Sequence, residues 1–313
     1  MSDIKLLCAP LQGFTEGVWR YAHAKVFGNC GGAADAYFSP FVRVEKGAVR
    51  SRDLRDIVWP LPEGVECVPQ IIFKDAEEFR LLTATITEKG FNRVDLNLGC
   101  PFPPQCHKGR GAAMVRRSDV LAQVKKAMEE MPDIVFSVKM RLGMEYPYEW
   151  RDSIHILNEM RLCHVAVHPR IGRQQYKGEL DITAFNELAA ELCHPVVFNG
   201  DIHSSDDIDR AMSINPGLYG VMVGRGLLAR PSLFAEWRSG ERWDNEHVKE
   251  ALLNMHEVIY NDYVERLAGE SQILSKLIPF WEYSEGIIGH KCFKSIRKSR
   301  NLNDYKKVIN TLC

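Results

Sequence analysis

The sequence predicts a (β/α)8 barrel followed by a small helical domain. Eight short apolar runs rich in β-branched residues recur between residues 4 and 226, and stretches with helical spacing separate most of them. Strands that alternate with helices in this way are typical of parallel βαβ units. Eight units over roughly 240 residues match the size of a (β/α)8 barrel, which is about 250 residues.

The expected strands lie at residues 4–10, 36–41, 67–73, 93–99, 134–140, 164–170, 195–201 and 220–226. Helices are expected between them, for example over residues 75–90 and 118–131, where apolar side chains recur every three or four positions. The competing architecture, an open doubly wound sheet, would place a glycine-rich GxGxxG turn after the first strand. The residues found there, APLQGFTEGVWR, lack that turn, which favours the barrel.

The pattern changes near residue 240. Residues 241–313 carry helical segments and no strand-like run, and the stretch WRSGERWDN marks the change. We therefore predict a barrel domain over residues 1–240 and a separate helical domain over residues 241–313.

Composition excludes few classes of protein. The chain has 313 residues, of which 45% are hydrophobic and 26% charged, and a net charge of −1 gives no global indication of a nucleic-acid partner. No signal-type segment and no run of about 18 apolar residues appear, so we expect no membrane insertion. The nine cysteines are scattered without a CxxC pair, which favours reduced thiols in the cytoplasm. The Cys-His dipeptides at residues 106, 163 and 193 lack the paired spacing of a metal site, so no metal is expected.

Polar residues gather at the ends of the predicted strands, where barrel enzymes build their active sites. In strand order these ends carry Ala9 and Pro10, Gln70, Asn97 with Cys100, Lys139 with Arg141, His168 with Arg170, Asn199 with Asp201, and Gly224 with Arg225. A coincidence of so many polar residues at one edge indicates a functional site.

The last two strand ends predict a phosphate site. NGD at residues 199–201 and GRG at residues 224–226 supply glycines and free backbone N–H groups, and Arg225 adds a fixed positive charge. We expect Asn199, Gly200, Asp201, Gly224 and Arg225 to hold a phosphorylated cofactor.

Lys139 is expected over the barrel mouth, where its cation could stabilise negative charge on a reduced flavin. Gln70, His168 and Asn199 could hydrogen-bond the flavin ring. An ion pair with a core carboxylate is the alternative for Lys139. Cys100 stands between a glycine and a proline where a strand pattern stops, and its alternative role is that of a small hydrophobe at a strand end.

Seven motifs, in chain order, resemble those of bacterial tRNA-dihydrouridine synthases. They are APLQGFTEGVWR, DLNLGCP, KGRGAAMV, VKMRLG, HPRIGRQQYKG, NGDI and VGRGLLARPSLF, and the match as a whole spans residues 4–234. The resemblance implies an enzyme that binds FMN and uses NADPH to reduce the double bond between carbon 5 and carbon 6 of selected uridines in tRNA. It also implies that Ala9 and Pro10 belong to the flavin site, and that Asn97, Arg141 and Arg170 face the substrate.

The implied reaction gives Cys100 a role. A hydride that passes from reduced flavin to carbon 6 leaves negative charge on carbon 5, so an acid must deliver a proton there. A thiol with an ordinary pKa of about 8.5 is mostly protonated at neutral pH. The prolines between residues 101 and 104 would stiffen the loop that holds it. One departure concerns Phe73, a bulky residue where the family pattern leads us to expect glycine near the flavin.

A basic segment supplies a candidate tRNA surface. Residues 291–307 contain seven Lys or Arg and one Asp, and Lys294, Arg297 and Lys298 recur at helical spacing. Lys108, Arg110, Arg116, Arg170, Arg173 and Lys177 are expected to add positive charge at the barrel mouth. A solvated basic helix without a partner is the alternative. We expect a monomer.

Two other functions stay open. An FMN barrel oxidoreductase that acts on a small molecule would share NGDI and GRG but would have no need for the basic helices. A barrel that binds RNA without catalysis would keep the basic surface but would have no use for Cys100, Lys139 and His168 together.

Overall fold

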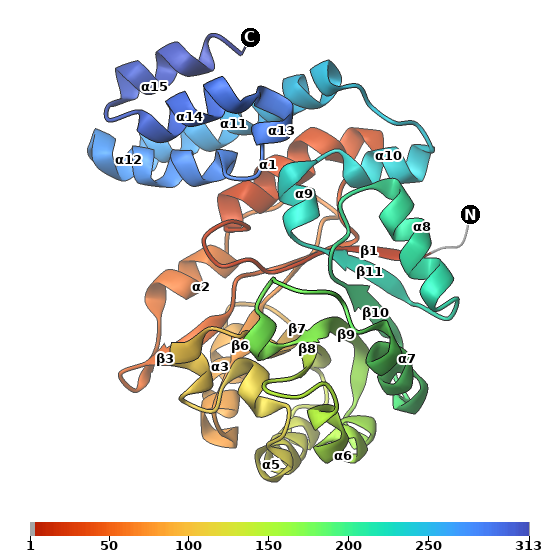
Figure 1. Ribbon diagram of the computed structural model, residues 1–313. Helices are drawn as coiled ribbons and strands as arrows, with labels where there is room; N and C mark the ends of the chain where they lie inside the picture. Colours follow the sequence, from red (N-terminus) through yellow and green to blue (C-terminus); the bar gives the residue numbers. More distant parts are fainter. Residues whose placement is uncertain (1–3, 313) are drawn as a thin grey trace.

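The computed structural model describes residues 4–312, which form a barrel with helices around it and a helical region at the C-terminus (Figure 1). The strands are β1 (Lys5–Cys8), β2 (Ala36–Phe38), β3 (Val42–Glu45), β4 (Ala48–Val49), β5 (Cys67–Val68), β6 (Gln70–Ile72), β7 (Arg93–Leu98), β8 (Val135–Gly143), β9 (Leu162–Ile171), β10 (Val196–Asn199) and β11 (Gly220–Val223). Each of the eight expected strands is present, so the predicted fold class is confirmed.

Two of the barrel strands are interrupted. β2 and β3 are separated by Ser39, Pro40 and Phe41, and β5 and β6 by Pro69 alone. Proline lacks the N–H that a strand ladder needs, so the hydrogen bonds are interrupted at Pro40 and Pro69. Ser39 connects the two broken strands: its backbone N donates to Val68 O at 3.1 Å, and its Oγ accepts from Gln70 N at 3.2 Å. Each broken pair is therefore one strand of the barrel.

The parallel ladder closes on itself once these breaks are taken into account. β1 pairs with β11 and β2, β2 with β5, and β3 with β6, while β6 to β11 follow one another in sheet order. The strand pairs are parallel except β3 with β4, an antiparallel hairpin that the sequence pattern did not predict. The carboxyl ends of the barrel strands consequently meet at one rim.

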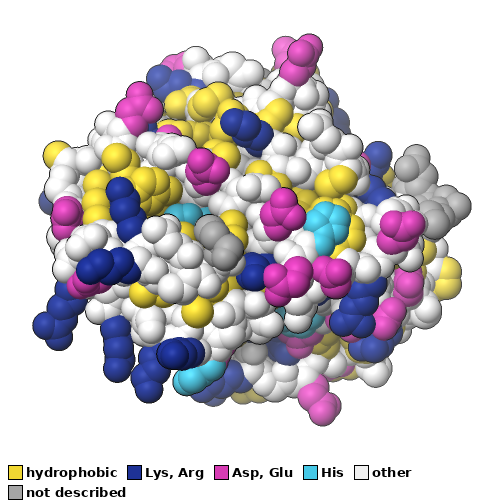
Figure 2. Space-filling view, turned by 90° about the horizontal axis from the view of Figure 1, so that it is seen from above, with side chains coloured by type: hydrophobic (Ala, Val, Ile, Leu, Met, Phe, Trp, Pro, Cys, Tyr) yellow, Lys and Arg dark blue, Asp and Glu magenta, His cyan; other side chains and the backbone are white. Residues whose placement is uncertain are grey.

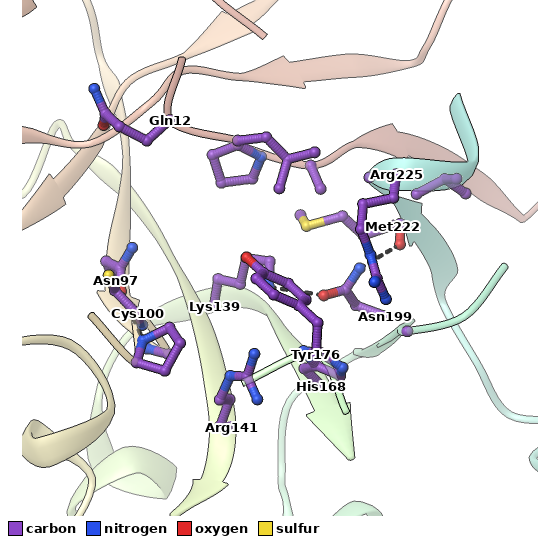
Figure 3. Close-up of a pocket in the computed structure, with 18 of the residues that line it drawn as sticks. Gln12, Asn97, Cys100, Lys139, Arg141, His168, Tyr176, Asn199, Met222 and Arg225 are labelled. Carbon is purple, nitrogen blue, oxygen red and sulfur yellow. Dashed lines mark hydrogen bonds between the residues drawn. The ribbon is translucent and has the colours of Figure 1, made fainter. Parts of the chain in front are cut away.

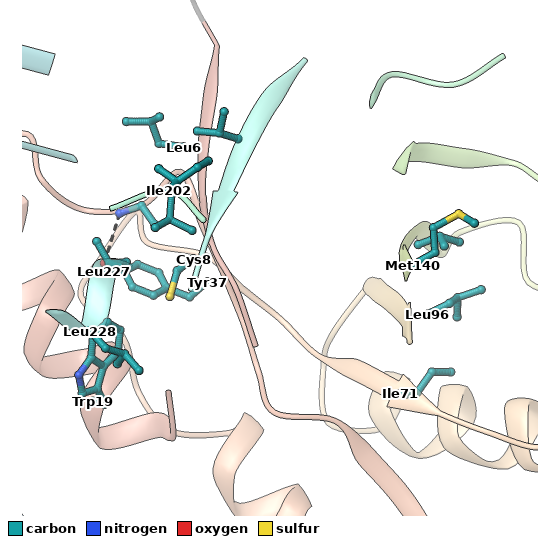
Figure 4. Close-up of a cluster of buried hydrophobic side chains, with 14 of the residues drawn as sticks. Leu6, Cys8, Trp19, Tyr37, Ile71, Leu96, Met140, Ile202, Leu227 and Leu228 are labelled. Atoms are coloured by element: carbon teal, nitrogen blue, oxygen red, sulfur yellow. Dashed lines mark hydrogen bonds between the residues drawn. The ribbon is translucent and has the colours of Figure 1, made fainter. Parts of the chain in front are cut away.

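Side chains along β1 alternate between two cores. Leu6 and Cys8 are fully buried among the helices outside the sheet, where Trp19 and Leu227 surround them (Figure 4). Leu7 faces the barrel interior, in a smaller cluster with residues such as Ala9, Phe38, Val197 and Met222. This period-two pattern explains why each strand read as an apolar run.

The helices outside the barrel are α1 (Gly17–Phe27), α2 (Ser51–Ile57), α3 (Ala76–Thr87), α4 (Pro103–Cys106), α5 (Ser118–Glu129), α6 (Ile154–Glu159), α7 (Ile182–Glu191), α8 (Ser205–Ile214), α9 (Arg225–Ala229) and α10 (Leu233–Ser239). Short 3-10 turns are η1 (Gly28–Cys30), η2 (Gly111–Met114), η3 (Glu149–Asp152), η4 (Gly172–Gln174) and η5 (Ile278–Trp281). Side-chain caps start several of the helices; Asp75 Oδ1, for example, accepts from Glu78 N at 2.8 Å.

The C-terminal region contains α11 (Asn245–Arg266), α12 (Glu270–Leu277), α13 (Glu285–Ile288), α14 (His290–Lys298) and α15 (Leu302–Ile309). A buried hydrogen-bonded group holds these helices together, because Tyr305 Oη lies 2.7 Å from both His256 Nε2 and Trp281 Nε1. α11 packs on α1 of the barrel. A domain boundary at residue 240 stays a prediction.

No helix within residues 4–312 is long and apolar enough to cross a membrane. Over the same residues, no group of three or more His, Cys, Asp or Glu is arranged to hold a metal ion.

Candidate active site

A pocket opens at the carboxyl ends of the barrel strands (Figure 3). It collects every residue that we expected to bind the cofactor, together with Cys100 and two of the expected substrate residues. These lining residues are Ala9, Pro10, Gln70, Asn97, Cys100, Lys139, Arg141, His168, Asn199, Gly200, Asp201, Gly224 and Arg225.

Lys139 lies in the middle of this pocket. Its Nζ donates to Asn199 Oδ1 at 2.7 Å, and Asn199 Nδ2 donates in turn to Met222 O at 2.6 Å. No ion pair joins Lys139 to a carboxylate in the described part of the chain, so the alternative role as an ion-pair partner is not observed. Burial, followed by repulsion from Arg141, lowers the pKa of the Lys139 amine to about 8.

A chain of buried amides leads from the barrel interior to Cys100. Asp95 Oδ2 accepts from Gln70 Nε2 at 2.7 Å, Gln70 Oε1 accepts from Asn97 Nδ2 at 2.7 Å, and Asn97 Oδ1 accepts from Cys100 N at 2.8 Å. Ser137 Oγ donates to the other oxygen of Asp95 at 2.6 Å. Burial raises the pKa of this carboxyl to about 6, and the hydrogen bonds from Ser137 and Gln70 act against that rise. The carboxylate thereby sets which way both amides face.

Cys100 begins the loop that follows β7. Its carbonyl oxygen accepts from Ala112 N at 3.0 Å and from the thiol of Cys106 at 3.3 Å. Gly111 passes so close, with a φ of +61°, that a Cβ there would lie 2.5 Å from this same oxygen. Burial raises the pKa of the Cys100 thiol above its ordinary value, so the thiol is protonated at neutral pH.

The loop after Cys100 is fastened to the barrel by Arg110. This residue is 4% exposed, and its guanidinium makes hydrogen bonds to both oxygens of Glu78, at 2.6 and 3.1 Å. Our expectation that Arg110 contributes to a cationic surface is therefore wrong. The other expected mouth cations of this loop, Lys108 and Arg116, are exposed.

Arg170 also differs from expectation. It is 3% exposed and lies outside the pocket lining, and both of its terminal nitrogens donate to the carboxylate of Asp201, one of them at 3.0 Å. Arg225 donates to that carboxylate as well, at 3.0 Å. Arg170 therefore acts from behind the pocket wall by holding Asp201, whose φ of +47° is unusual for a residue other than glycine.

The two predicted phosphate turns pack directly on each other. A Cβ on Gly226 would lie 1.8 Å from Ile202 O, so only glycine allows the start of α9 to approach the turn after β10. The backbone of Gly200 and Asp201 is thereby held next to Gly224 and Arg225, as the sequence pattern predicted.

His168 is buried and uncharged. Burial, followed by repulsion from neighbouring arginines and Lys139, lowers its pKa well below 6.5. Arg170 NH1 lies 3.2 Å from His168 Nε2. An arginine can only donate, so Nε2 accepts and the proton of the neutral ring is on Nδ1.

Tyr176 is a pocket residue that sequence reasoning missed. It is 47% exposed, and its ring lies between two cations, with the guanidinium carbons of Arg225 and Arg141 at 4.7 and 5.6 Å from the ring centre. Figure 3 shows the ring above the space between Lys139 and Asn199. The only signal in the sequence is one aromatic residue within the basic, polar loop RQQYKG.

Phe73 is absent from the pocket. It is 1% exposed and packs edge-to-face on Phe79 of α3, with ring centres 5.7 Å apart, so it belongs to the core outside the barrel. Lys294, Arg297 and Lys298 are exposed on α14, which belongs to the helical region (Figure 1), and none of them lines the pocket.

The pocket suits a flavin nucleotide. A flavin offers a flat polar ring and, in FMN, a terminal phosphate. Gln70 and Asn199 could supply hydrogen-bonding amides to such a ring, and Lys139 a cation. The glycine turns at residues 200 and 224, with Arg225, could hold a phosphate.

The fold and the pocket define a class of protein, the flavin-dependent oxidoreductases built on a (β/α)8 barrel. Solved structures with a similar fold include morphinone reductase, with a TM-score of 0.51 and 10% identity over 77% of this chain and 87% of that one. The old yellow enzyme from Trypanosoma cruzi has a TM-score of 0.53 and 9% identity over 77% and 89% of the two chains. At such low identity the likeness concerns the fold alone.

The model of the dihydrouridine synthase family matches residues 7–295, and the chain belongs to that family. A probable tRNA-dihydrouridine synthase from Staphylococcus aureus (strain COL) is 26% identical over 268 residues, which cover 82% of this chain and 77% of that protein. The tRNA-dihydrouridine(16) synthase from Neisseria meningitidis serogroup B is 28% identical over 243 residues, or 73% and 69% of the two chains. The resemblance seen in the sequence is thus confirmed.

Proposed function

We propose that the protein is a tRNA-dihydrouridine synthase that binds FMN and takes electrons from NADPH. The observation that carries the proposal is the position of the Cys100 thiol in the wall of the same pocket that holds Lys139. In Figure 3, Cys100 and Asn97 stand on one side of the pocket and Arg225 and Met222 on the other. A uracil that enters between these sides reaches an acid and a cation at once.

Cys100 acts as the general acid. Reduced FMN, when bound, supplies a hydride to carbon 6 of uracil, and the thiol gives its proton to carbon 5. The raised pKa of Cys100 keeps that proton available at neutral pH. The amide chain from Asp95 to Cys100 holds the backbone of the acid in place.

Lys139, Asn97 and Arg141 stabilise the negative charge that develops on the uracil and the flavin. Each lines the pocket, and burial lowers the pKa of Arg141 to about 10, so both cations remain charged at neutral pH. A partly desolvated cation interacts more strongly with developing charge than one in water.

The cofactor is held at two places. Ala9, Pro10, Gln70, Lys139, His168 and Asn199 contact the ring side, and Gly200, Asp201, Gly224 and Arg225 hold the phosphate. The carboxylate of Asp201 is already shared by Arg170 and Arg225, so the phosphate contact at residue 201 is its backbone N–H rather than its side chain.

The tRNA binds across the helical region, which we propose as a tRNA-binding domain over residues 241–313 beside a catalytic domain over residues 1–240. Figure 2 shows Lys and Arg side chains gathered along one edge, on the side where Figure 1 places α12 and α14. Lys294, Arg297 and Lys298 are exposed there for phosphate contacts. The eight described cysteines are all free, which supports a reducing compartment, and we propose a cytoplasmic monomer.

The test is a reconstituted reaction with protein, FMN, NADPH and an unmodified tRNA transcript. We expect a yellow protein and a mass gain of two hydrogens on uridine residues of the tRNA. The same preparation is offered free uridine and other small unsaturated carbonyl compounds. Faster turnover of these compounds than of tRNA would favour a small-molecule oxidoreductase and overturn the proposal, and a colourless protein that binds tRNA would indicate a non-catalytic RNA-binding barrel.

A further inference from the structure

The loop between β1 and α1 borders two hollows. Residues 9–12 of this loop line the active-site pocket, whereas Gly13, Phe14 and Glu16 line a groove between the barrel and the helical region. The opposite wall of the groove comes from the helical region and includes Lys276 and Tyr283. The groove is thus separated from the pocket by this loop and by the start of α9.

Two aromatic rings meet across the groove. Phe14 from the barrel and Tyr283 from the helical region are edge-to-face, with ring centres 5.3 Å apart, and both are partly exposed. Tyr283 is close enough to the pocket residue Arg225 for the charge of that guanidinium to act on it. The aromatic wall of the groove therefore lies beside the pocket entrance.

The charge of the groove favours an anion. Glu16 is the partner of two cations: its Oε2 accepts from Lys276 Nζ at 2.5 Å, and its Oε1 accepts from Arg52 NH2 at 3.3 Å. One carboxylate between two cations leaves these three residues with a net charge of about +1, and the exposed Glu282 acts on Tyr283 with a charge of the opposite sign. Arg52 is more than half exposed, so it can turn toward a phosphate.

We propose that this groove is a second subsite, which holds the RNA nucleotide next to the uridine that is reduced. The neighbouring base stacks on Tyr283, and its phosphate lies near Arg52 and Lys276. Aromatic faces beside cations are the usual means of holding an unpaired nucleotide. The subsite rests on the proposed function, because a uridine in the pocket fixes where its neighbour lies.

The experiment combines a protein variant with a change in the RNA. Synthetic stem-loop RNAs carry the target uridine with an intact base or an abasic sugar at its 5′ or its 3′ neighbour. For the parent protein, we expect one of the two abasic RNAs to lower kcat/KM by roughly 5- to 150-fold, the range of one base stacked on an aromatic ring. Tyr283→Ala is expected to lower kcat/KM by a similar factor on intact RNA and to add nothing further on that abasic RNA. Tyr283→Phe, which keeps the ring, is expected to restore the parental value.

A matched control is Tyr219→Ala, because Tyr219 is also exposed but precedes β11, at the opposite end of the barrel. It should leave the response to abasic RNA unchanged. Equal losses for Tyr283→Ala on intact and abasic RNA would assign Tyr283 a structural role and overturn the subsite. If the parent has the same kcat/KM on both abasic RNAs as on intact RNA, the subsite is overturned. This outcome does not depend on whether Tyr283→Ala folds. A parent that reduces no uridine at all overturns the proposed function together with the subsite, so the two failures are distinguishable.

Discussion

Lys139 Nζ donates a 2.7 Å hydrogen bond to Asn199 Oδ1 over the width of β9, which separates their strands in the barrel wall. The bond uses the neutral oxygen of an amide, so it holds the ammonium group without neutralising it. The site therefore presents a cation that has no ion-pair partner and is only partly offset by the charge of Asp95, and burial makes that cation costly to keep.

This cost should appear as a pH dependence of stability. The pKa of Lys139 is about 8 in the folded protein and 10.5 ordinarily, so between these values the unfolded chain binds more protons. The free energy of unfolding of the flavin-free protein should rise with pH across that window, by up to about 3 kcal/mol, relative to Lys139→Met. Urea unfolding at a series of pH values measures this difference. If the free energy of unfolding changes with pH equally in the two proteins, burial does not lower the pKa of Lys139.

Cys100→Ala should lose about 100- to 10,000-fold in the rate of tRNA reduction, the usual contribution of a general acid. Flavin binding and flavin reduction by NADPH should persist, because neither step needs the thiol. Stopped-flow absorbance separates the two half-reactions. Cys163→Ala, whose thiol lies near Arg93 at the other end of the barrel, is the control. Near-parental tRNA reduction by Cys100→Ala would exclude the thiol as the acid.

Gly111→Ala and Gly109→Ala form a matched pair. Both glycines have positive φ, but a Cβ at Gly109 meets only the flexible end of Arg117, at 3.3 Å, whereas one at Gly111 meets the Cys100 carbonyl. Gly109→Ala should cost about 1–2 kcal/mol of stability and little activity. Gly111→Ala should cost roughly 3 kcal/mol or more and displace the acid, with a large loss of rate. Urea unfolding measures the stability of each variant, and turnover measures its activity. Equal losses of stability and activity in the two variants would contradict this account.

Arg225→Glu should empty the phosphate site. In the parent, Arg225 donates a hydrogen bond to the carboxylate of Asp201. The new carboxylate would instead repel both Asp201 and the cofactor phosphate. Flavin content per protein, read from the absorption spectrum, should fall close to zero. Arg210→Glu on α8, an exposed arginine outside the pocket, should remain yellow. A folded Arg225→Glu protein with parental flavin content would place the phosphate elsewhere.

Neutralising Lys294, Arg297 and Lys298 together should weaken tRNA binding without loss of flavin. The slope of log affinity against log salt should fall by roughly one for each phosphate contact removed. Neutralising Arg80, Lys125 and Lys126, which belong to α3 and α5, is the control for total charge. Identical slopes for the parent and the α14 variant would mean that the RNA lies on another surface.

The strands and the pocket residues were predictable because they follow local rules. Short apolar runs rich in β-branched residues located every barrel strand, and polar residues at strand ends must meet when parallel strands form a ring. Thus Gln70, Cys100, Lys139 and Asn199, which are far apart in the chain, could be placed at one pocket. Their individual roles remain predictions.

Burial of single polar residues was not predictable in this way. Arg110 and Arg170 look like surface cations in sequence, and only their partners Glu78 and Asp201, more than 30 residues away, reveal that they are internal. Such pairings depend on tertiary contacts that no local pattern contains. Phe73 is a different case, because strand alternation counted from Gln70 puts it on the outer face with Ile71, and only the family pattern led us to expect it near the flavin.

The closure of the strand ladder has a mechanical consequence. A ring of hydrogen-bonded strands has no free edge from which to peel apart, so the floor of the pocket keeps its shape while the protein stays folded. The connecting segments at residues 99–117 and 172–181 lie outside this ring, and Cys100 and Tyr176 from them line the pocket. Backbone amides of β7 and β8 should therefore exchange with solvent deuterium only as fast as the whole barrel unfolds, and those segments should exchange through small local openings that a bound substrate suppresses.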